Sequence, residues 1–305
     1  MLCGYIFIKF RFFSFLRLQY AAIKNVTATQ TIFMRHINEF LQHIALPVMP
    51  EVAHPLIRTL NDDQVALSDL KDLVAQDPTL TTQVLRLANS AGLGMQHQVS
   101  SLEHALALLG TDQVRALAIS ACMNVAFPVA AGFDRREFWK NCMSCAGYAH
   151  WMAEKLGHNT NGAWLCGMML RLGELLIALH EPHTLAVIER QPHIPGQRWS
   201  REASVVGFTE AQVMAELAQR WTFPQTIVDG LRQADAPLAA DALNPLSGVV
   251  HLASWLADMP FCAPEVIDLL PAPLLERLGL DPQWMRDSLP QPEEFFEMAH
   301  EADAS

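Results

Sequence analysis

The fold of this 305-residue chain is decided by the stretch Asp77–Ser90, which reads DPTLTTQVLRLANS. Asp77 is a typical helix N-cap, and Pro78 suits the first helical position because its missing N–H needs no partner there. Apolar residues then recur at three- and four-residue spacing, which predicts an amphipathic helix. Its buried stripe comprises Leu80, Val84, Leu87 and Ala88. We expect the helix to end at Gly92.

The next segment predicts two more helices. Ser100 and Glu103 read as a capping box, with Ser100 accepting a hydrogen bond from the helix and Glu103 reaching back. This helix should end at Gly110, and Thr111 or Asp112 should cap the following one. The residues expected to face inward are Leu102, Ala105, Leu106 and Leu109 in the first helix and Val114, Leu117, Ala118 and Ala121 in the second.

The same periodicity continues to about Asp258, without a convincing run of alternating strand character. Further helices are predicted at about 136–156, 162–179, 181–191, 200–221, 224–234 and 247–257. Breaks are expected at Gly157, Gly207 and 191–196. The predicted fold class is all-α.

Composition narrows the functional classes. The chain is 51% apolar, enough to bury a sizeable core. Its formal net charge of −11 argues against nucleic acid as the first partner, because that role requires a basic face. Six cysteines in 305 residues are no disulfide framework, so we expect a reducing compartment and a cytoplasmic location.

Composition also suggests four segments. Residues 1–33 are aromatic and basic with no acid, and contact a membrane surface only if they are translated; translation could start at Met1 or at Met34, and we favour Met34. Residues 34–130 and 131–258 form two helical halves expected to pack against each other. Residues 259–305 are a Pro-rich and acidic C-terminal segment, in which 291–305 should form a terminal helix with a frayed end.

Three motifs suggest chemistry, but structural explanations suit them better. Cys142 and Cys145 form a C-x-x-C inside a helical pattern, where a redox or metal role would need a preceding strand or further ligands such as His150 or Cys166. The turn at 108–111 resembles a helix-turn-helix connection but lacks a basic recognition helix. The histidines, His180 and His183 included, lack an accompanying carboxylate motif.

Five segments, in order and spacing, resemble the HDOD family: Leu46–Pro50 (LPVMP), Asp77–Leu80 (DPTL), Leu85–Ala91 (LRLANSA), Val99–Leu102 (VSSL) and Leu108–Gly110 (LLG). The resemblance covers about residues 40–258. It implies an HD-like helical bundle with an additional N-terminal helical subdomain. HDOD domains resemble the HD and HD-GYP metal-dependent phosphohydrolases but are regarded as bacterial-type output or regulatory modules.

The resemblance also implies where metal ligands would stand in an active HD relative. The aligned positions carry Asn141, Leu170, Arg171, Glu210, Gln233, Ala234 and Ser254. Apart from Glu210, none of these is a usual ligand, and Arg171 puts a positive charge where a cation would lie. We therefore predict no catalytic residue, no metal and no cofactor. These side chains either fill a vestigial pocket, with Arg171 and Glu210 as an ion pair, or form a repurposed ligand site.

The leading functional hypothesis is a non-catalytic signal-transduction module, a pseudoenzyme that acts by binding another protein. One alternative is a receptor for a nucleotide or other anion, in which Arg171 pairs with a phosphate or carboxylate. A further alternative is a phosphohydrolase with an atypical metal site drawing ligands from His180, His183 or Cys142. The sequence does not identify the partner or the oligomeric state.

Overall fold

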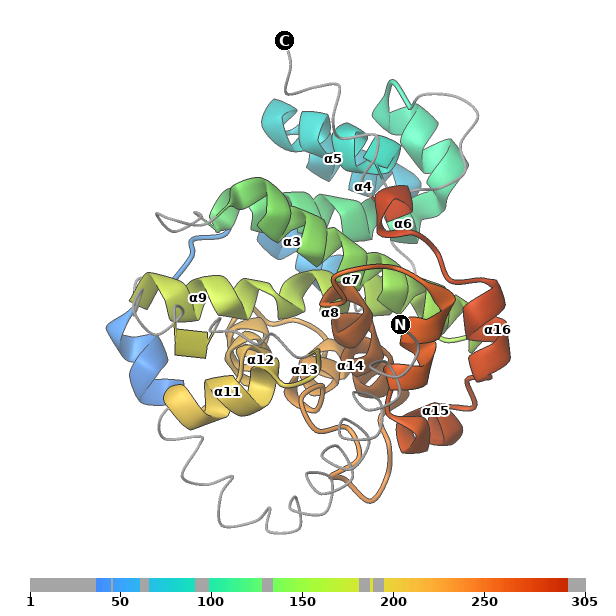
Figure 1. Ribbon diagram of the computed structural model, residues 1–305. Coiled ribbons are helices and arrows are strands. Elements are labelled where there is room, and N and C mark those ends of the chain that lie inside the picture. The colour runs from blue at the N-terminus through green and yellow to red at the C-terminus, as the bar shows by residue number, and fades with distance from the viewer. Residues whose placement is uncertain are drawn as a thin grey trace, which may run out of the picture.

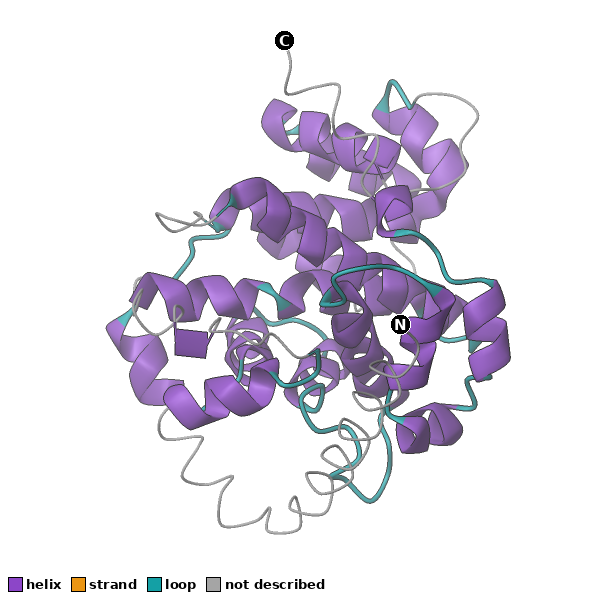
Figure 2. Cartoon of the chain, viewed as in Figure 1, coloured by secondary structure: helices purple, strands orange, loops and turns teal. Residues whose placement is uncertain are grey.

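The computed structural model describes residues 37–44, 46–60, 66–90, 99–127, 134–180, 187–188 and 195–295. These residues form helices joined by loops and contain no strand, which confirms the all-α prediction (Figure 2). A first helix spans 37–43. The N-terminal helices that follow are α3 (Ala53–Thr59), α4 (Leu67–Ala75), α5 (Pro78–Ser90) and α6 (Leu102–Ala126). The central helices are α7 (Arg135–Lys155), α8 (Thr160–Leu170), α9 (Leu172–His180), α11 (Arg198–Val205), α12 (Glu210–Arg220), α13 (Gln225–Arg232) and α14 (Pro245–Ala257).

The C-terminal elements are η1 (Pro264–Leu269), α15 (Ala272–Leu278), α16 (Pro282–Asp287) and η2 (Pro292–Phe295). Helices α7 and α8 run through the middle of the molecule, with α3 to α6 on one side and α11 to α14 on the other (Figure 1). Helix α7 packs along α8 and α14, and α6 packs on α8, so helices from the two predicted halves are in contact.

The first helix also contacts the second half of the chain. Phe40 packs against Phe208 with ring centroids 4.8 Å apart, and Nη2 of Arg220 donates to Oδ1 of Asn38 at 3.2 Å. Residues 1–36 lie outside the described part, so the predictions made for 1–33 and for Met34 stay predictions.

The Asp77-Pro78 start is confirmed. Oδ1 of Asp77 accepts from the backbone N–H groups of Thr79 and Leu80 at 2.8 and 3.1 Å. Leu80, Val84 and Ala88 are buried, whereas the expected stop at Gly92 lies outside the described residues.

Asn89, near the end of α5, hydrogen-bonds to the backbone of Val99, which precedes α6. Its Oδ1 accepts from the N–H of Val99 at 2.8 Å, and its Nδ2 donates to the carbonyls of Val99 and Leu85 at 2.9 and 2.7 Å. One amide therefore satisfies both backbone groups of Val99, which is buried.

The predicted capping box at Ser100 is wrong by one residue. Ser101 is the N-cap of α6, because its backbone is extended and its Oγ accepts from the N–H of His104 at 3.1 Å. The predicted end at Gly110 corresponds to a kink with φ 78° and ψ 170°, after which the helix continues. Glycine adopts this left-handed backbone without a steric penalty. The inward residues Val114, Leu117, Ala118 and Ala121 are buried as predicted.

Two of the predicted helices are each two helices in the structure, 162–179 as α8 and α9 and 200–221 as α11 and α12. The helix expected at 162–179 is divided at Arg171 into α8 and α9, where Gly173 lies so close to the backbone of Glu210 that a Cβ would be 2.3 Å from its carbonyl oxygen. The predicted break at Gly207 is confirmed, and Thr209 with Gln212 forms the capping box of α12. The helix predicted at 181–191 lies outside the described residues apart from 187–188.

The terminal helix predicted from Gln291 is wrong at its start, where the chain forms the 3-10 helix η2; residues 296–305 lie outside the described part. Phe295, the last residue of this turn, packs against Gly147 of α7.

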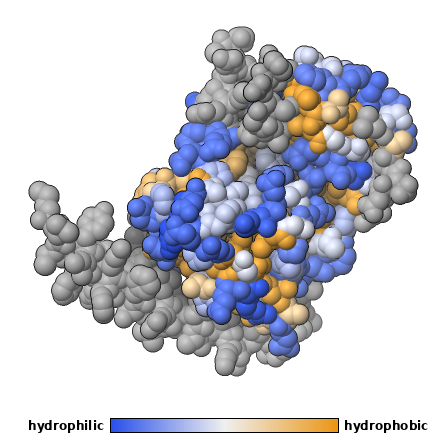
Figure 3. All heavy atoms as spheres, turned by 90° about the vertical axis from the view of Figure 1, so that its right-hand side faces the viewer, coloured by the Kyte–Doolittle hydropathy of each residue, from blue (hydrophilic) through white to orange (hydrophobic). Residues whose placement is uncertain are grey.

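Two segments are long and apolar enough in composition to cross a membrane, Leu102–Ala126 and Thr160–Leu179. Of their most apolar windows, 67% and 89% is buried inside the protein, so packing within the bundle accounts for their composition. On the face seen in Figure 3, apolar residues lie in separate patches between hydrophilic ones.

The Asn89 bridge yields a first prediction. Replacing Asn89 with Ala should lower the free energy of unfolding by about 2–4 kcal/mol, because both backbone groups of buried Val99 lose their partner. Urea denaturation measures this loss. Asn38→Ala, which removes an exposed amide contact, is the control and should cost less than about 0.5 kcal/mol. Equal effects of the two substitutions would contradict the role assigned to Asn89.

Candidate functional site: a buried ion-pair cluster

Arg171 is the centre of the polar interior. It ends α8 and is 1% exposed. Its Nη1 donates to Oε1 of Glu210 at 2.9 Å, which confirms the predicted ion pair. Its Nη2 donates to the carboxylate of Asp258 and, at 3.5 Å, to the carbonyl oxygen of Ser254. Because Glu210 begins α12 and Asp258 follows α14, one guanidinium joins three parts of the bundle.

A second arginine extends the cluster on α11. Nη2 of Arg198 lies 3.1 Å from Oε1 of Glu174, and its Nε donates to Oε1 of Glu202 at 3.0 Å. Oε2 of Glu202 accepts from the backbone N–H of Glu210 at 2.8 Å, and Oε2 of Glu210 lies 3.6 Å from Nε of Arg198. Trp199 Nε1 donates to Oε1 of Glu210 at 3.1 Å. The cluster thus holds two arginines and four carboxylates.

Burial decides the protonation of the cluster. Burial alone would lower the pKa of Arg171, but Asp258 and Glu210 outweigh it and hold that pKa above its ordinary value. Burial and the neighbouring Glu210 charge raise the pKa of Glu202 well above its ordinary value. Arg171 therefore stays charged, while the surroundings of Glu202 favour the protonated form of this carboxyl group more than water does.

His251 of α14 borders the cluster as a neutral ring. Its Nδ1 donates to the carbonyl of Ala234 at 2.7 Å, and its ring lies 4.9 Å from that of Trp199. Burial lowers the pKa of His251 to about 4, although the hydrogen bond to Ala234 opposes this shift. The imidazole is therefore uncharged at neutral pH.

Of the other residues aligned with HD ligands, three lie in or beside the cluster, and the remaining two, Asn141 and Gln233, make no contact with Arg171 that the structure records. Ala234 and Ser254 supply carbonyls to the cluster and its border, and Leu170 is fully buried beside Arg171. Asn141 lies on α7, and its Nδ2 donates to the carbonyl of Ala257 at 2.9 Å. Gln233 ends α13, and its buried Oε1 has no hydrogen-bond partner among the described residues.

Sequence reasoning missed several members of the cluster: Asp258, Arg198, Glu202, Glu174 and Trp199. Two signals were available. Asp258 follows Ser254 by four residues, the spacing that puts two side chains on the same helix face. Arg198 and Glu202 are also four residues apart, a spacing at which opposite charges on a helix can pair. Neither signal shows that the two pairs meet at Arg171.

The residues at this position do not fit a divalent cation. Such a cation needs several carboxylate or imidazole ligands in common, but Glu210 and Asp258 are engaged by the Arg171 guanidinium. Within the described ranges, no three His, Cys, Asp or Glu side chains come together as a metal-binding group. His183 and the side chain of His180 lie outside the described part.

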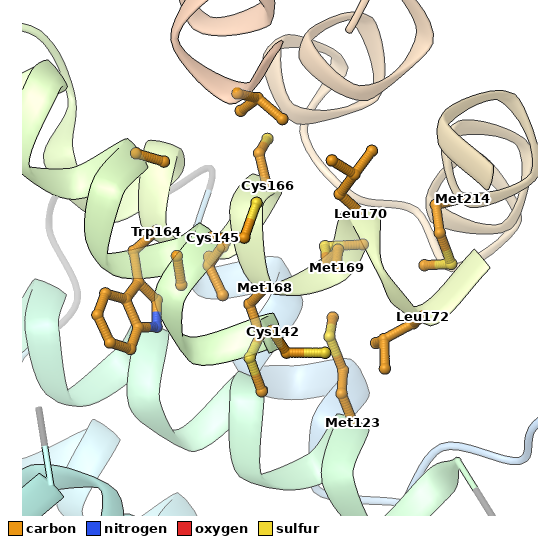
Figure 4. Close-up of a cluster of buried hydrophobic side chains, with 14 of the residues drawn as sticks. Met123, Cys142, Cys145, Trp164, Cys166, Met168, Met169, Leu170, Leu172 and Met214 are labelled. Carbon is orange, nitrogen blue, oxygen red and sulfur yellow. The ribbon is translucent and has the colours of Figure 1, made fainter. Parts of the chain in front are cut away.

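The C-x-x-C thiols belong to the apolar core. Cys142 and Cys145 lie inside α7 and are buried with Cys166 among methionine and leucine side chains (Figure 4). Burial raises the pKa of Cys145 to about 12, and the pKa of Cys142 is also raised well above its ordinary value. Both remain thiols at neutral pH, which favours the structural explanation over a redox one. His150, named above as a possible further ligand, packs edge to face on Trp164, with ring centroids 6.3 Å apart.

Residues 46–237 match the HDOD domain family. This match covers more than half of the chain, and it agrees with the order of the motifs from Leu46 to Gly110 and with the helical bundle around Arg171. The chain belongs to the HDOD domain family.

Relatives agree on the fold. An uncharacterized protein of Treponema pallidum (strain Nichols) is 26% identical over 222 residues, which cover 68% of this chain and 41% of that protein. The chain therefore spans about two-fifths of this relative's length. A structure from Shewanella amazonensis SB2B, named as a proposed phosphohydrolase, has a TM-score of 0.68 and 25% identity, covering 88% of this chain and 97% of that one.

Two further structures share the fold at lower identity. An HDOD domain protein with unknown function from Geobacter sulfurreducens has a TM-score of 0.70 and 22% identity, and the similarity covers 90% of this chain and 95% of that one. A proposed signal transduction protein from Marinobacter aquaeolei VT8 has a TM-score of 0.71 and 21% identity, covering 92% of this chain and 67% of that one.

The buried ion pairs yield a second prediction. Arg171→Met should lower the free energy of unfolding by about 3–5 kcal/mol, because it leaves two buried carboxylates without their cation. The triple variant Arg171→Met, Glu210→Gln, Asp258→Asn should recover most of this loss. Arg232→Met, which removes a half-exposed pair with Asp229, is the control and should cost about 1 kcal/mol or less. A triple variant no more stable than Arg171→Met would refute the electrostatic explanation.

His251 yields a third prediction, on pH dependence. Its pKa is depressed in the folded state, so the unfolded chain binds its proton first as the pH falls below about 6.5. This group should therefore remove about 2 kcal/mol of stability between pH 7 and pH 5. His251→Leu should be less stable at pH 7 but lose less on acidification, as measured by urea denaturation at both pH values. His54→Leu alters an exposed histidine and should keep the wild-type slope.

Proposed function

We propose that this HDOD protein is a non-catalytic regulator that transmits a signal by binding a partner protein. The observation that carries the proposal is the Arg171 guanidinium, buried between Glu210 and Asp258. It occupies a position that the resemblance to HD enzymes assigns to metal chemistry, and it satisfies the carboxylates that a cation would need. A preserved scaffold without such a centre leaves its surfaces as the means of action.

The names of the relatives support two different activities. The Shewanella relative is named as a proposed phosphohydrolase and the Marinobacter relative as a proposed signal transduction protein. The buried pairing of Arg171 favours the second activity for this chain. The free cysteines support a reducing compartment, in line with the proposed cytoplasmic location, because the five that the structure describes form no disulfide.

The alternative, an anion receptor, would require Arg171 to exchange its present partners for a ligand. A phosphate or carboxylate ligand would have to displace Glu210 and Asp258 from the terminal nitrogens of Arg171, which is 1% exposed. Two buried carboxylates would then lose their cation, at a cost of several kcal/mol. This cost disfavours the receptor, and adding nucleotides in a thermal-shift experiment tests it directly.

A fourth prediction tests the proposed function. The full chain, purified and supplied with Mg²⁺ or Mn²⁺, should show no hydrolysis of cyclic dinucleotides or of a chromogenic phosphodiester above the protein-free rate. Its melting temperature should not rise with added nucleotide. Metal-dependent turnover that disappears in Glu210→Gln, with Glu216→Gln as the surface control, would establish an enzyme instead.

The proposed function also predicts that the chain forms a complex with a specific partner protein. Proteins that copurify with the full chain are identified by mass spectrometry, and each is then produced separately and mixed with the chain. At least one should form a complex of fixed stoichiometry in the absence of metal and nucleotide. A nucleotide-induced rise in melting temperature that is lost in Arg171→Met but kept in Arg232→Met would favour the receptor.

A further inference from the structure

The C-terminal segment that follows α14 lies outside the family match, and its element η2 packs against α7. Trp284 of α16 stacks on Trp151 with centroids 4.8 Å apart and planes inclined by 22°. Nζ of Lys155 lies 4.9 Å from the centroid of the Trp284 ring. These contacts fix α16 beside the second half of α7.

Further along, the segment ends in a notch at Gly147. A Cβ on Gly147 would lie 2.3 Å from Cδ1 of Phe295, so the Phe295 ring rests against the bare backbone of α7. The ring also meets Tyr148 edge to face, with centroids 5.1 Å apart. Phe295 is 9% exposed. Glycine inside a helix costs about 1 kcal/mol relative to alanine, so this glycine has a packing reason rather than a helical one.

Among the residues of η2, Phe295 is the one that is buried. The hydrogen bonds of this turn are internal, because the N–H of Glu294 donates to the carbonyl of Gln291 at 3.0 Å and the N–H of Gln291 donates to Oε1 of Glu294 at 2.8 Å. In the described part of the chain, no hydrogen bond joins Pro292–Phe295 to α7. A short turn anchored by a single ring opens at low free-energy cost.

The segment before η2 is held more firmly. Oη of Tyr148 donates to the carbonyl of Pro290 at 3.4 Å, and Sγ of Cys262 lies 3.4 Å from the same carbonyl and 3.5 Å from the Tyr148 Oη. An opening of η2 would therefore pivot after Pro290 and leave α16 in place. It would uncover the Gly147 backbone and the edge of Tyr148, the surfaces that the Phe295 ring now covers.

We propose that the Gly147 notch is a docking site for a partner protein that presents a phenylalanine on a tight turn, and that Pro292–Phe295 occupies this site in cis. The chain's own segment defines the chemistry that the notch accepts, a proline-initiated turn ending in an aromatic anchor. A tethered occupant competes at an effective concentration of about 1 mM, so the partner has to displace it. This inference rests on the proposed function, because it names how such a regulator binds its partner.

The test separates the occupant from the notch. Phe295→Ala in the full chain empties the notch, and Gly147→Ala fills it while improving the local helix propensity. A labelled peptide with the sequence of Ser288–Phe295 is titrated against each variant by fluorescence anisotropy. We expect Phe295→Ala to bind the peptide, the wild type to bind it about tenfold more weakly, and the double variant Phe295→Ala, Gly147→Ala not to bind it.

Two controls complete the experiment. A peptide with Ala in place of the final Phe should not bind any variant, and circular dichroism should show the same helix content and a cooperative melt for all of them. Failure of Phe295→Ala to bind the peptide would overturn the docking site. Equal binding by the wild type and Phe295→Ala would overturn the blocking in cis. Neither result depends on whether the protein hydrolyses a phosphodiester, so failure here is distinguishable from failure of the proposed function.

Discussion

A guanidinium keeps its charge even when it is only 1% exposed, so carboxylates have to surround it to offset the cost of its burial, and in this protein that requirement fixes how three helices meet. Arg171 ends α8, Glu210 begins α12 and Asp258 follows α14. The cost of removing these charges from water is several kcal/mol per ion, which only close pairing in the folded state offsets. An arrangement that separated any of the three helices would leave a buried charge alone. The ion pairs therefore favour one arrangement of the bundle over other compact ones.

The charged groups of the cluster pair mainly with one another, and this pairing bears on function more than the charge of the cluster does. Catalytic cation sites keep a coordination position open for water or substrate. Here the terminal nitrogens of Arg171 bind the carboxylates of Glu210 and Asp258, and the indole N–H of Trp199 donates to the same Glu210 oxygen that Arg171 binds. The surplus of carboxylates is relieved within the protein, since the raised pKa of Glu202 allows it to hold a proton. Polar groups paired in this way stabilise a fixed structure and leave little capacity to bind a substrate.

Local signals in the sequence predicted the helices well, and tertiary contacts explain most of the errors. Asp77 and Pro78 predicted the start of α5 because capping depends only on neighbouring residues. The Arg171–Glu210 pair was predictable because the family resemblance aligned both positions. The approach of Asp258 was not, since it depends on how α14 packs. Likewise, the composition of residues 291–305 favours a helix, but Pro292–Phe295 form a 3-10 helix in which Phe295 packs against Gly147.

The interior and the C-terminal segment differ in the strength of the contacts that hold them in place. A regulator that acts by binding a partner needs a rigid interior and a peripheral segment that can move. The helices around Arg171 are joined by buried ion pairs whose loss would be costly, so their arrangement should not change when a partner binds. The turn at Pro292–Phe295 depends on one ring against a glycine, so its position can change without disturbing that interior. Ligands shift equilibria between states of similar free energy far more readily than they rearrange a packed core. If the protein acts as proposed, the part that responds to a protein partner is therefore its periphery, while the ion-pair cluster keeps the scaffold constant.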